Sequence, residues 1–271
     1  MTKPQSGTWS TAKNVGEGDV LKVPRPKEGE GLTDVHLATL TVNPPTAYNV
    51  LRDFVDLEEG DWVVQNGANS AVGQAVIQVA AARGIKTLNF VRNRDNLSEL
   101  VKWLEGLGAT KVLTYDDLSD KSVRDKIKEW TRGKGIKLGL NCVGGKETSL
   151  MARLMGKDAH LVSYGAMSKQ PLSFPTSLFI FQNLTSHGFW QARWYQANSR
   201  EKRQELVNAL IDLAREGKLK APESEILTLE ADKSDAAIEK EVREIVKKVS
   251  AGRYGKKVLL SIETHESQHG S

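Results

Sequence analysis

The sequence predicts an α/β protein built on a Rossmann-type, doubly wound parallel sheet. One observation is the stretch from Asp61 to Gly73, in which a β-branched and aromatic run is followed by a loop of small residues and then by an apolar helix. Such a run is typical of a strand buried in a parallel sheet. The other observation is the regular alternation of later apolar runs with helix-length segments, which favours parallel strands with crossover helices on both faces.

The expected elements follow one another with little ambiguity from residue 43 onward. A helix begins near Asn43, because Pro44 and Pro45 are tolerated in a first helical turn. The helix that starts at Gly73 places its apolar residues on one face and stops before Gly84, a typical C-terminal position. Strands are expected near residues 62–66, 86–91, 111–114, 136–143, 159–164 and 185–190. In such a sheet, the ligand crevice lies at the carboxyl ends of the strands.

The two chain ends read differently from this central part. Residues 1–42 are rich in glycine, proline and charge, with short extended pieces at 8–11 and 20–23. After a helix at 199–216, a charged helix at 232–249 and a strand at 257–262 are expected. The expected organisation is therefore an N-terminal segment, a nucleotide-binding domain, a C-terminal return and a polar, disordered tail, at residues 1–42, 43–218, 219–262 and 263–271.

Composition excludes several classes of function. The chain has 271 residues, of which 39% are hydrophobic and 27% charged, and no stretch approaches the roughly 18 apolar residues of a membrane span. Cys142 is the only cysteine, so no internal disulfide can form, and without a cysteine–histidine cluster no metal is expected. A net charge of +4 suits an anionic cofactor and is only thin support for nucleic-acid binding. The N-terminal residues show no targeting peptide.

The loop between the first strand and its helix is the candidate phosphate site. The three glycine positions of a G-x-G-x-x-G fingerprint are filled by Ala68, Ser70 and Gly73. The free N–H groups of residues 70–73 and the positive end of the helix dipole would face a phosphate. The alternative is a buried strand–helix corner in which small residues serve packing only.

The end of the second strand indicates which dinucleotide binds. Arg92 and Arg94 follow it, about 20 residues beyond the loop, where an acidic residue would hold the ribose 2′-hydroxyl of NAD and arginines accommodate a 2′-phosphate. The sequence therefore favours NADPH over NADH. The alternative is that both arginines belong to a solvated basic loop.

Later strand ends offer walls for a ligand rather than an obvious catalytic group. Tyr164–Gly165 and Phe189–Trp190 each lie at the end of a predicted strand, and either pair could line a pocket or merely pack. Tyr164 and Lys169 are five residues apart, one more than the Tyr-x-x-x-Lys pair of short-chain reductases requires. The five histidines show no ligand spacing, and no Ser-His-Asp arrangement can be assembled.

Seven stretches of the sequence have recognisable wording when they are taken together. They are Gly7-Thr-Trp-Ser10, Val42-Asn-Pro-Pro-Thr-Ala-Tyr48, Gln65-Asn-Gly-Ala-Asn-Ser-Ala-Val-Gly-Gln74, Val91-Arg-Asn-Arg-Asp95, Leu140-Asn-Cys-Val-Gly-Gly-Lys146, Tyr164-Gly-Ala-Met-Ser-Lys-Gln-Pro171 and Gly188-Phe-Trp190. With them the chain resembles, from about Ser6 to Ile262, the mitochondrial 2-enoyl thioester reductases, NADPH-dependent members of the medium-chain dehydrogenase/reductase superfamily. It implies reduction of trans-2-enoyl thioesters on acyl carrier protein or coenzyme A in mitochondrial fatty-acid synthesis. It also implies a homodimer and a mitochondrial matrix location.

The resemblance assigns roles to individual positions. Asn43 would lie near the nicotinamide, and Lys256 would contact the cofactor from the C-terminal segment. The pyrophosphate would lie along Asn69, Ser70, Ala71 and Val72, and the 2′-phosphate would be held by Arg92, Asn93 and Arg94. The nicotinamide and acyl pocket would be walled by Tyr164, Gly165, Ala166, Met167, Phe189, Trp190 and Gln191.

The sequence also departs from the family pattern. Family members carry an N-terminal GroES-like domain, of which roughly one hundred residues would precede Gly7, and the proton-donating tyrosine of the family lies there. We therefore expect an incomplete GroES-like β domain formed by the chain ends, no catalytic residue in this chain and impaired proton transfer. The alternative function is a non-catalytic module that binds NADPH or interacts with RNA or protein.

Overall fold

The computed structural model describes residues 12–230, 232–250 and 257–262. The chain divides into two compact units, one from Leu40 to Lys220 and one formed by Met1–Thr39 together with Ala221–Ser271. We describe each unit by itself.

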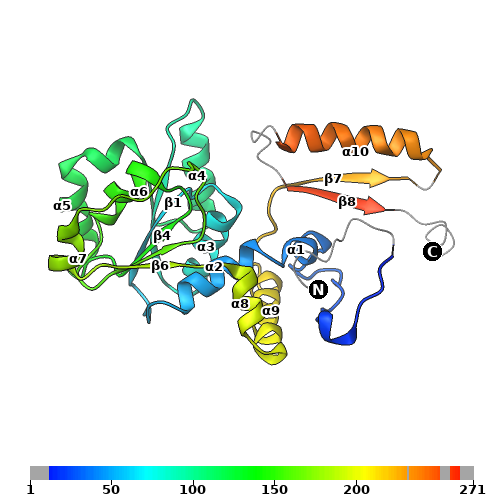
Figure 1. Cartoon of the computed structure of the whole chain (residues 1–271), viewed down its shortest axis with the longest axis horizontal. Coiled ribbons are helices and arrows are strands. Elements are labelled where there is room, and N and C mark those ends of the chain that lie inside the picture. Colours follow the sequence, from blue (N-terminus) through cyan, green and yellow to red (C-terminus); the bar gives the residue numbers. More distant parts are fainter. Residues whose placement is uncertain (1–11, 231, 251–256, 263–271) are drawn as a thin grey trace. The chain divides into compact units, whose positions relative to one another are not determined.

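The larger unit contains a six-stranded, fully parallel sheet with the strand order β3-β2-β1-β4-β5-β6 (Figure 1). This order confirms the Rossmann-type, doubly wound fold. The strands are β1 (Trp62–Asn66), β2 (Lys86–Val91), β3 (Lys111–Thr114), β4 (Leu138–Asn141), β5 (His160–Ser163) and β6 (Thr185–Gly188). The helices are α2 (Asn43–Arg52), α3 (Ala71–Ala82), α4 (Leu97–Gly106), η2 (Asp116–Ser119), α5 (Lys121–Trp130), α6 (Gly145–Ala152), α7 (Thr176–Gln182), α8 (Gln191–Ala197) and α9 (Arg200–Arg215).

Alternate residues of the central strands point to opposite faces of this sheet, and each face is covered by helices. Trp62 and Val64 belong to a cluster that also contains Ile127 of α5 and Met151 of α6. On the other side, the cluster around Val91 contains residues of α3 and α4. Strands covered in this way are apolar on both faces, which explains their continuous hydrophobic runs.

The fourth strand is shorter than the sequence predicted, because it runs from Leu138 to Asn141 rather than from residue 136 to residue 143. The Asn141 side-chain oxygen accepts hydrogen bonds from the backbone N–H groups of Val143 and Gly144, both at 3.0 Å. These bonds turn the chain out of the sheet, since Gly144 adopts a φ of 85° that favours glycine. Strands β5 and β6 likewise end one or two residues earlier than expected.

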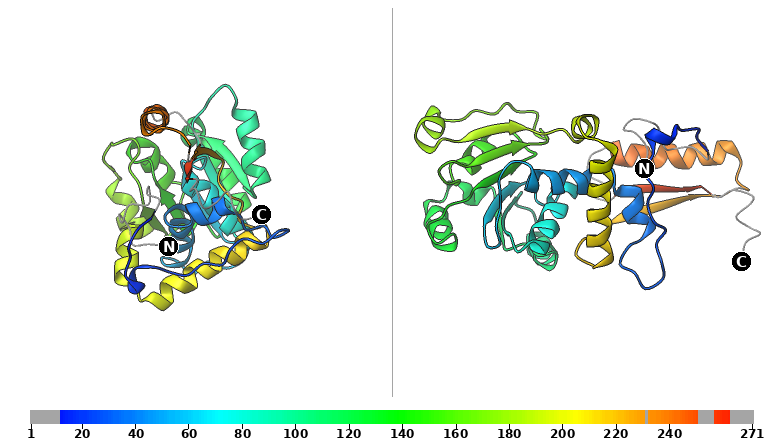
Figure 2. Two further views of the ribbon diagram at one scale, coloured as in Figure 1. Left: turned by 90° about the vertical axis from the view of Figure 1, so that its right-hand side faces the viewer. Right: turned by 90° about the horizontal axis from the view of Figure 1, so that it is seen from below.

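The smaller unit contains η1 (Glu17–Asp19), α1 (Asp34–Thr39), β7 (Ser224–Leu229), α10 (Asp235–Ser250) and β8 (Lys257–Ile262). Strands β7 and β8 pair in parallel. Helix α10 connects them and lies along one face of the pair (Figures 1 and 2). The expected extended piece at residues 20–23 forms no strand and contributes only an isolated bridge at Val20, since Pro24 follows and has no N–H to donate. The expected pieces at 8–11 and the tail 263–271 lie outside the described residues.

Candidate functional site

The candidate site lies at the carboxyl ends of β1, β2, β4 and β5. Strand β1 is central: β2 and β3 lie to one side of it, and β4, β5 and β6 lie to the other (Figure 1). The chain therefore leaves β1 and β4 in opposite directions, which opens a crevice between the segments that follow them. Most of the residues that the sequence analysis singled out follow these strands.

The N-terminus of α3 is arranged to receive an anion. Ser70 caps the helix, because its side-chain oxygen accepts a hydrogen bond from the Gly73 N–H at 3.1 Å. The N–H groups of Ala71 and Val72 donate to no other residue in the described part of the chain. Gly73 has a packing role, because a Cβ there would lie 2.6 Å from the Ala68 carbonyl oxygen. The loop is thus held close to β1 while its free N–H groups face outward.

A buried polar network supports this loop from below. Asn66, at the end of β1, donates hydrogen bonds to the side chains of Asn141 and Thr148, both at 3.0 Å. Its own side-chain oxygen accepts from the Cys142 N–H at 2.8 Å, and Asn141 donates to the Ser163 hydroxyl at 2.9 Å. The network therefore ties the ends of β1, β4 and β5 together, and the positions of the loops that follow are fixed by side chains as well as by the sheet.

Tyr164 and Cys142 lie together at the carboxyl ends of β5 and β4. The Tyr164 hydroxyl is fully buried beside the Cys142 thiol and the Ser70 hydroxyl, and it makes no hydrogen bond of ordinary geometry. Burial raises the pKa of Tyr164 well above its usual value, and burial also raises the pKa of the Cys142 thiol. Both groups therefore stay protonated near neutral pH.

The segment after Tyr164 passes over the same cysteine. The Met167 N–H donates to the Cys142 carbonyl at 2.9 Å, while the Met167 side chain is 66% exposed. Gly165 approaches so closely that a Cβ would lie 3.2 Å from the Cys142 Cβ, and Ala166 is exposed. The structure therefore brings the predicted residues Ser70 and 164–167 together around Cys142.

The residues predicted to hold a 2′-phosphate follow β2 at its carboxyl end. Arg92 and Asn93 are exposed and Arg94 is half-buried. The Asn93 amide donates to the Asp116 carboxylate at 3.1 Å. The Tyr115 hydroxyl accepts a hydrogen bond from the Gly67 N–H at 2.9 Å, and burial raises the pKa of Tyr115 to about 12 although nearby Arg92 opposes this.

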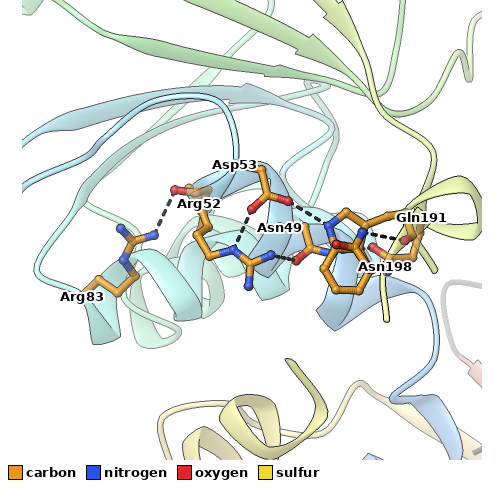
Figure 3. Close-up of polar contacts among 8 residues, drawn as sticks. Asn49, Arg52, Asp53, Arg83, Gln191 and Asn198 are labelled. Atoms are coloured by element: carbon orange, nitrogen blue, oxygen red, sulfur yellow. Dashed lines mark hydrogen bonds and ion pairs between the residues drawn. The ribbon is translucent and has the colours of Figure 1, made fainter. Parts of the chain in front are cut away.

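The predicted wall at residues 189–191 is divided between two environments. Trp190 is 64% exposed, whereas the Phe189 ring lies edge-on against Phe54 at 6.0 Å. Gln191 is buried and accepts a hydrogen bond from Asn49 of α2 at 3.1 Å (Figure 3). Its amide nitrogen has no partner among the described residues.

A second group of contacts in Figure 3 fixes α8 against the C-terminus of α2. The Arg52 guanidinium donates to Asp53 at 2.6 Å and to Asn49 at 2.9 Å. It also lies over the Tyr48 and Trp194 rings, at 5.4 and 5.7 Å. The Trp194 indole N–H donates to Asp53 at 3.0 Å. These contacts therefore hold α8 in place beside α2, and Trp190 directly precedes α8.

Two predicted residues are not brought to the others by any described contact. Asn43 is the first residue of α2 and is half-buried. Lys256 lies outside the described residues. Their predicted roles at the cofactor stay predictions.

The sequence analysis missed Tyr115, Asp116, Asn66 and Asn141. Tyr115 and Asp116 follow the third strand, so the strand-end signal that pointed to the other segments applied to them as well. The two asparagines end buried strands, where a polar residue inside an apolar run signals a structural hydrogen bond.

Two further kinds of feature, a membrane span and a metal site, are absent from the part of the chain that the structure describes. No helix there is long and apolar enough to cross a membrane. In the same residues, no three histidine, cysteine, aspartate or glutamate side chains lie close enough together to hold a metal ion.

Comparison with known proteins shows what this site is similar to. Residues 71–211 match the zinc-binding dehydrogenase family. The mitochondrial enoyl-[acyl-carrier-protein] reductase of Yarrowia lipolytica is 42% identical over 254 residues, which are 94% of this chain and 65% of that protein. The human protein of the same name is 41% identical over 219 residues, which are 80% of this chain and 56% of that protein. The chain thus spans less than two thirds of the length of these relatives.

Solved structures give the same result. A complex of Etr1p with NADP and crotonyl-CoA has a TM-score of 0.81 and 36% identity, and the match covers 90% of this chain and 68% of that one. The mitochondrial 2-enoyl thioester reductase Etr1p/Etr2p heterodimer of Candida tropicalis has a TM-score of 0.77 and 37% identity, with 86% of this chain and 66% of that one covered. The chain belongs to the mitochondrial enoyl-[acyl-carrier-protein] reductases, a family within the zinc-binding dehydrogenases.

Proposed function

We propose that this chain binds NADPH and reduces the carbon–carbon double bond of trans-2-enoyl thioesters, carried on acyl carrier protein or coenzyme A, in mitochondrial fatty-acid synthesis. Two features of the site support the proposal. The N-terminus of α3, which follows β1, has free N–H groups, and two arginines follow the neighbouring strand β2. These positions fit NADPH, because in Rossmann folds the pyrophosphate lies at the first of them and the 2′-phosphate at the second. A location in the mitochondrial matrix is part of the proposal.

The roles at the adenosine end follow from this geometry. Residues 69–72 lie along the pyrophosphate, where the N–H groups of Ala71 and Val72 donate to its oxygens. Arg92 and Arg94 contact the 2′-phosphate, and the Asn93 amide adds a further donor.

The proposal also assigns roles at the nicotinamide end. Residues 164–167 and 189–191 would wall the nicotinamide and acyl pocket, and the family resemblance alone gives Asn43 and Lys256 as further cofactor contacts. The Tyr164 hydroxyl, which stays protonated, is a buried hydrogen-bond donor beside Cys142 and Ser70. Exposed Met167 and Trp190 supply apolar surface for an acyl chain.

Bound NADPH would supply the hydride that adds to the β-carbon of the thioester. Negative charge then develops on the thioester oxygen, and a donor near that oxygen stabilises it. A proton must also reach the α-carbon.

A second copy of the chain is the proposed partner of the β6 edge. Within the described residues, β6 pairs with β5 alone, so its other backbone edge is open. Helix α7 precedes it and exposes Ile180 and Phe181, whose accessible fractions are 67% and 71%. An open edge beside exposed apolar side chains is suited to pairing with the same edge of a second copy. Light scattering on the Ile180→Glu, Phe181→Glu double variant tests this, and a monomer is expected.

The function is tested by titrating the protein with NADPH by fluorescence and by following NADPH oxidation with crotonyl-CoA. We expect saturable NADPH binding that weakens at least about 10-fold when Arg92 and Arg94 are both replaced by leucine, since charge-assisted contacts to phosphate are lost. The matched control replaces two exposed arginines elsewhere in the same unit, Arg124 and Arg153, by leucine. Binding without turnover would support the non-catalytic alternative, and no binding would refute both.

A further inference from the structure

A carboxylate lies in the subsite proposed for the 2′-phosphate. The Asn93 side-chain amide donates to the Asp116 carboxylate at 3.1 Å, and both residues are exposed. An acidic side chain is unexpected there, because a phosphate and a carboxylate repel one another. A carboxylate at this position would affect the choice between NADPH and NADH.

The sheet accounts for the meeting of these two residues. Strands β2 and β3 are neighbours, with Val91 opposite Thr114, so the residues that follow them lie side by side at the carboxyl edge. The next acidic residue, Asp117, does not share this position, because its carboxylate accepts from the Thr114 N–H and hydroxyl, both at 2.7 Å. Asp116 is thus the carboxylate that faces the end of β2.

The cationic residues follow β2 at the same edge of the sheet. Arg92 precedes Asn93, whose amide donates to Asp116, and the Arg92 guanidinium lies near the hydroxyl of Tyr115, the residue before Asp116. Neither Arg92 nor Arg94 forms an ion pair with a described carboxylate.

We infer that Asp116 limits how strongly this site prefers NADPH over NADH. The inference rests on the proposed NADPH binding and names the residue that tunes it. The Asp116 carboxylate repels a 2′-phosphate, and it can accept a hydrogen bond from the 2′-hydroxyl of NADH, which is the interaction that acidic residues make in NAD sites. At the same time it holds the Asn93 amide nitrogen and leaves that group's second hydrogen free for a ligand.

The size of the effect follows from exposure. Two exposed charges several ångströms apart interact in nearly bulk dielectric, and salt screens them over about 8 Å at physiological ionic strength. Removing the carboxylate charge should therefore tighten NADPH binding by about 3- to 10-fold at low salt and by less at high salt. A purely structural role for Asp116 would not give this salt dependence.

The test uses Asp116→Asn, which keeps an oxygen that can accept from Asn93 while removing the charge. The matched control is Asp158→Asn, because the Asp158 carboxylate also accepts from an asparagine amide, that of Asn183 at 2.9 Å, but precedes β5 at the opposite end of the sheet. Dissociation constants for NADPH and NADH are measured by fluorescence at low and at high salt. We expect the NADH-to-NADPH ratio of dissociation constants to rise for Asp116→Asn and to stay unchanged for Asp158→Asn.

The outcomes separate the two proposals. Suppose that the protein binds NADPH but that the NADH-to-NADPH ratio of dissociation constants is unchanged or lower in Asp116→Asn. This result overturns the role of Asp116 and leaves the proposed function intact. A gain in NADPH affinity that does not shrink with salt also overturns it. If the unsubstituted chain does not bind NADPH, the proposed function fails and this inference fails with it. The variant Asp116→Ala adds a second check, because it removes the charge and the anchor of Asn93 together and should gain less than Asp116→Asn.

Discussion

The two ends of the six-stranded sheet differ in how completely their polar groups are paired. At the amino end, the Asp61 carboxylate accepts from Lys137 at 2.7 Å and from the Glu58 N–H at 3.0 Å, and Asn183 donates to Asp158. At the carboxyl end, the N–H groups of Ala71 and Val72 at the start of α3 donate to no described residue, although the Asn66–Asn141 network beneath them is paired. The amino end is paired for stability, whereas the carboxyl end keeps these backbone donors available for a ligand.

The largest expected effect is the loss of stability on replacing Asn141, which is buried at the carboxyl end of the sheet. Asn141 is 1% exposed, and its side-chain oxygen accepts from Asn66, Thr148 and the backbone of residues 143 and 144. Asn141→Ala leaves several buried donors unsatisfied, so we expect a loss of about 3–5 kcal/mol in the free energy of unfolding. Chemical denaturation measures it. The control is Asn208→Ala, an exposed asparagine on α9, which should change stability by less than about 0.5 kcal/mol. Equal effects would contradict the special role of the network.

A smaller effect is expected where the loop meets β1. In Gly73→Ala the new Cβ would approach three backbone atoms within 2.7 Å, those being Ala68 O, Ala68 Cα and Gly67 O. Backbone cannot yield as a side chain does, so we expect a loss of about 1–3 kcal/mol in stability together with weaker NADPH binding. The control, Gly106→Ala, has open space around its Cβ at the end of α4 and should be neutral or slightly stabilising. Normal NADPH binding by Gly73→Ala would show that the loop position does not matter.

At the amino end of the sheet, the contribution of Asp61 to stability should depend on pH. Burial raises the pKa of Asp61, but the hydrogen bonds from Lys137 and the Glu58 N–H outweigh it and lower the pKa below its usual value. A lowered pKa in the folded state means that Asp61 contributes stability above its unfolded pKa of about 3.9 and that this contribution is lost as the pH falls through the folded value. Asp61→Asn should therefore cost about 1–2 kcal/mol at pH 7, and the difference should narrow in acid. The exposed Asp125→Asn serves as control. A pH-independent difference would contradict the ion pair.

The smallest effect concerns the histidine pair of β5 and β6. His160 Nδ1 and His187 Nε2 are 2.8 Å apart, and burial followed by the nearby His160 lowers the pKa of His187. The neutral ring is thus favoured in the folded state, so stability should fall as the pH drops from about 6.5 through the lowered value. We expect a loss of about 0.5 kcal/mol between pH 7 and pH 5.5, absent in His187→Gln. Thermal unfolding at the two pH values measures it, and an identical loss in the variant would assign it elsewhere.

The sequence predicted the six strands and the helices between them because their hydrophobic periods reflect burial on both faces of a sheet. It also placed the candidate residues at strand ends, since topology alone brings carboxyl ends together. It did not predict that Asn141 would end β4 early, or that Asp116 would bind Asn93. Both depend on side-chain hydrogen bonds between segments far apart in the chain, which periodicity does not contain.

The small sheet has a consequence for amide hydrogen exchange. Among the described residues, β7 and β8 pair only with each other, so each strand directs about half of its backbone groups away from its neighbour. Strand β1 is flanked by β2 and β4 and is fully buried. Deuterium should therefore enter residues 224–229 and 257–262 long before it reaches residues 62–66, unless another strand covers the open edges.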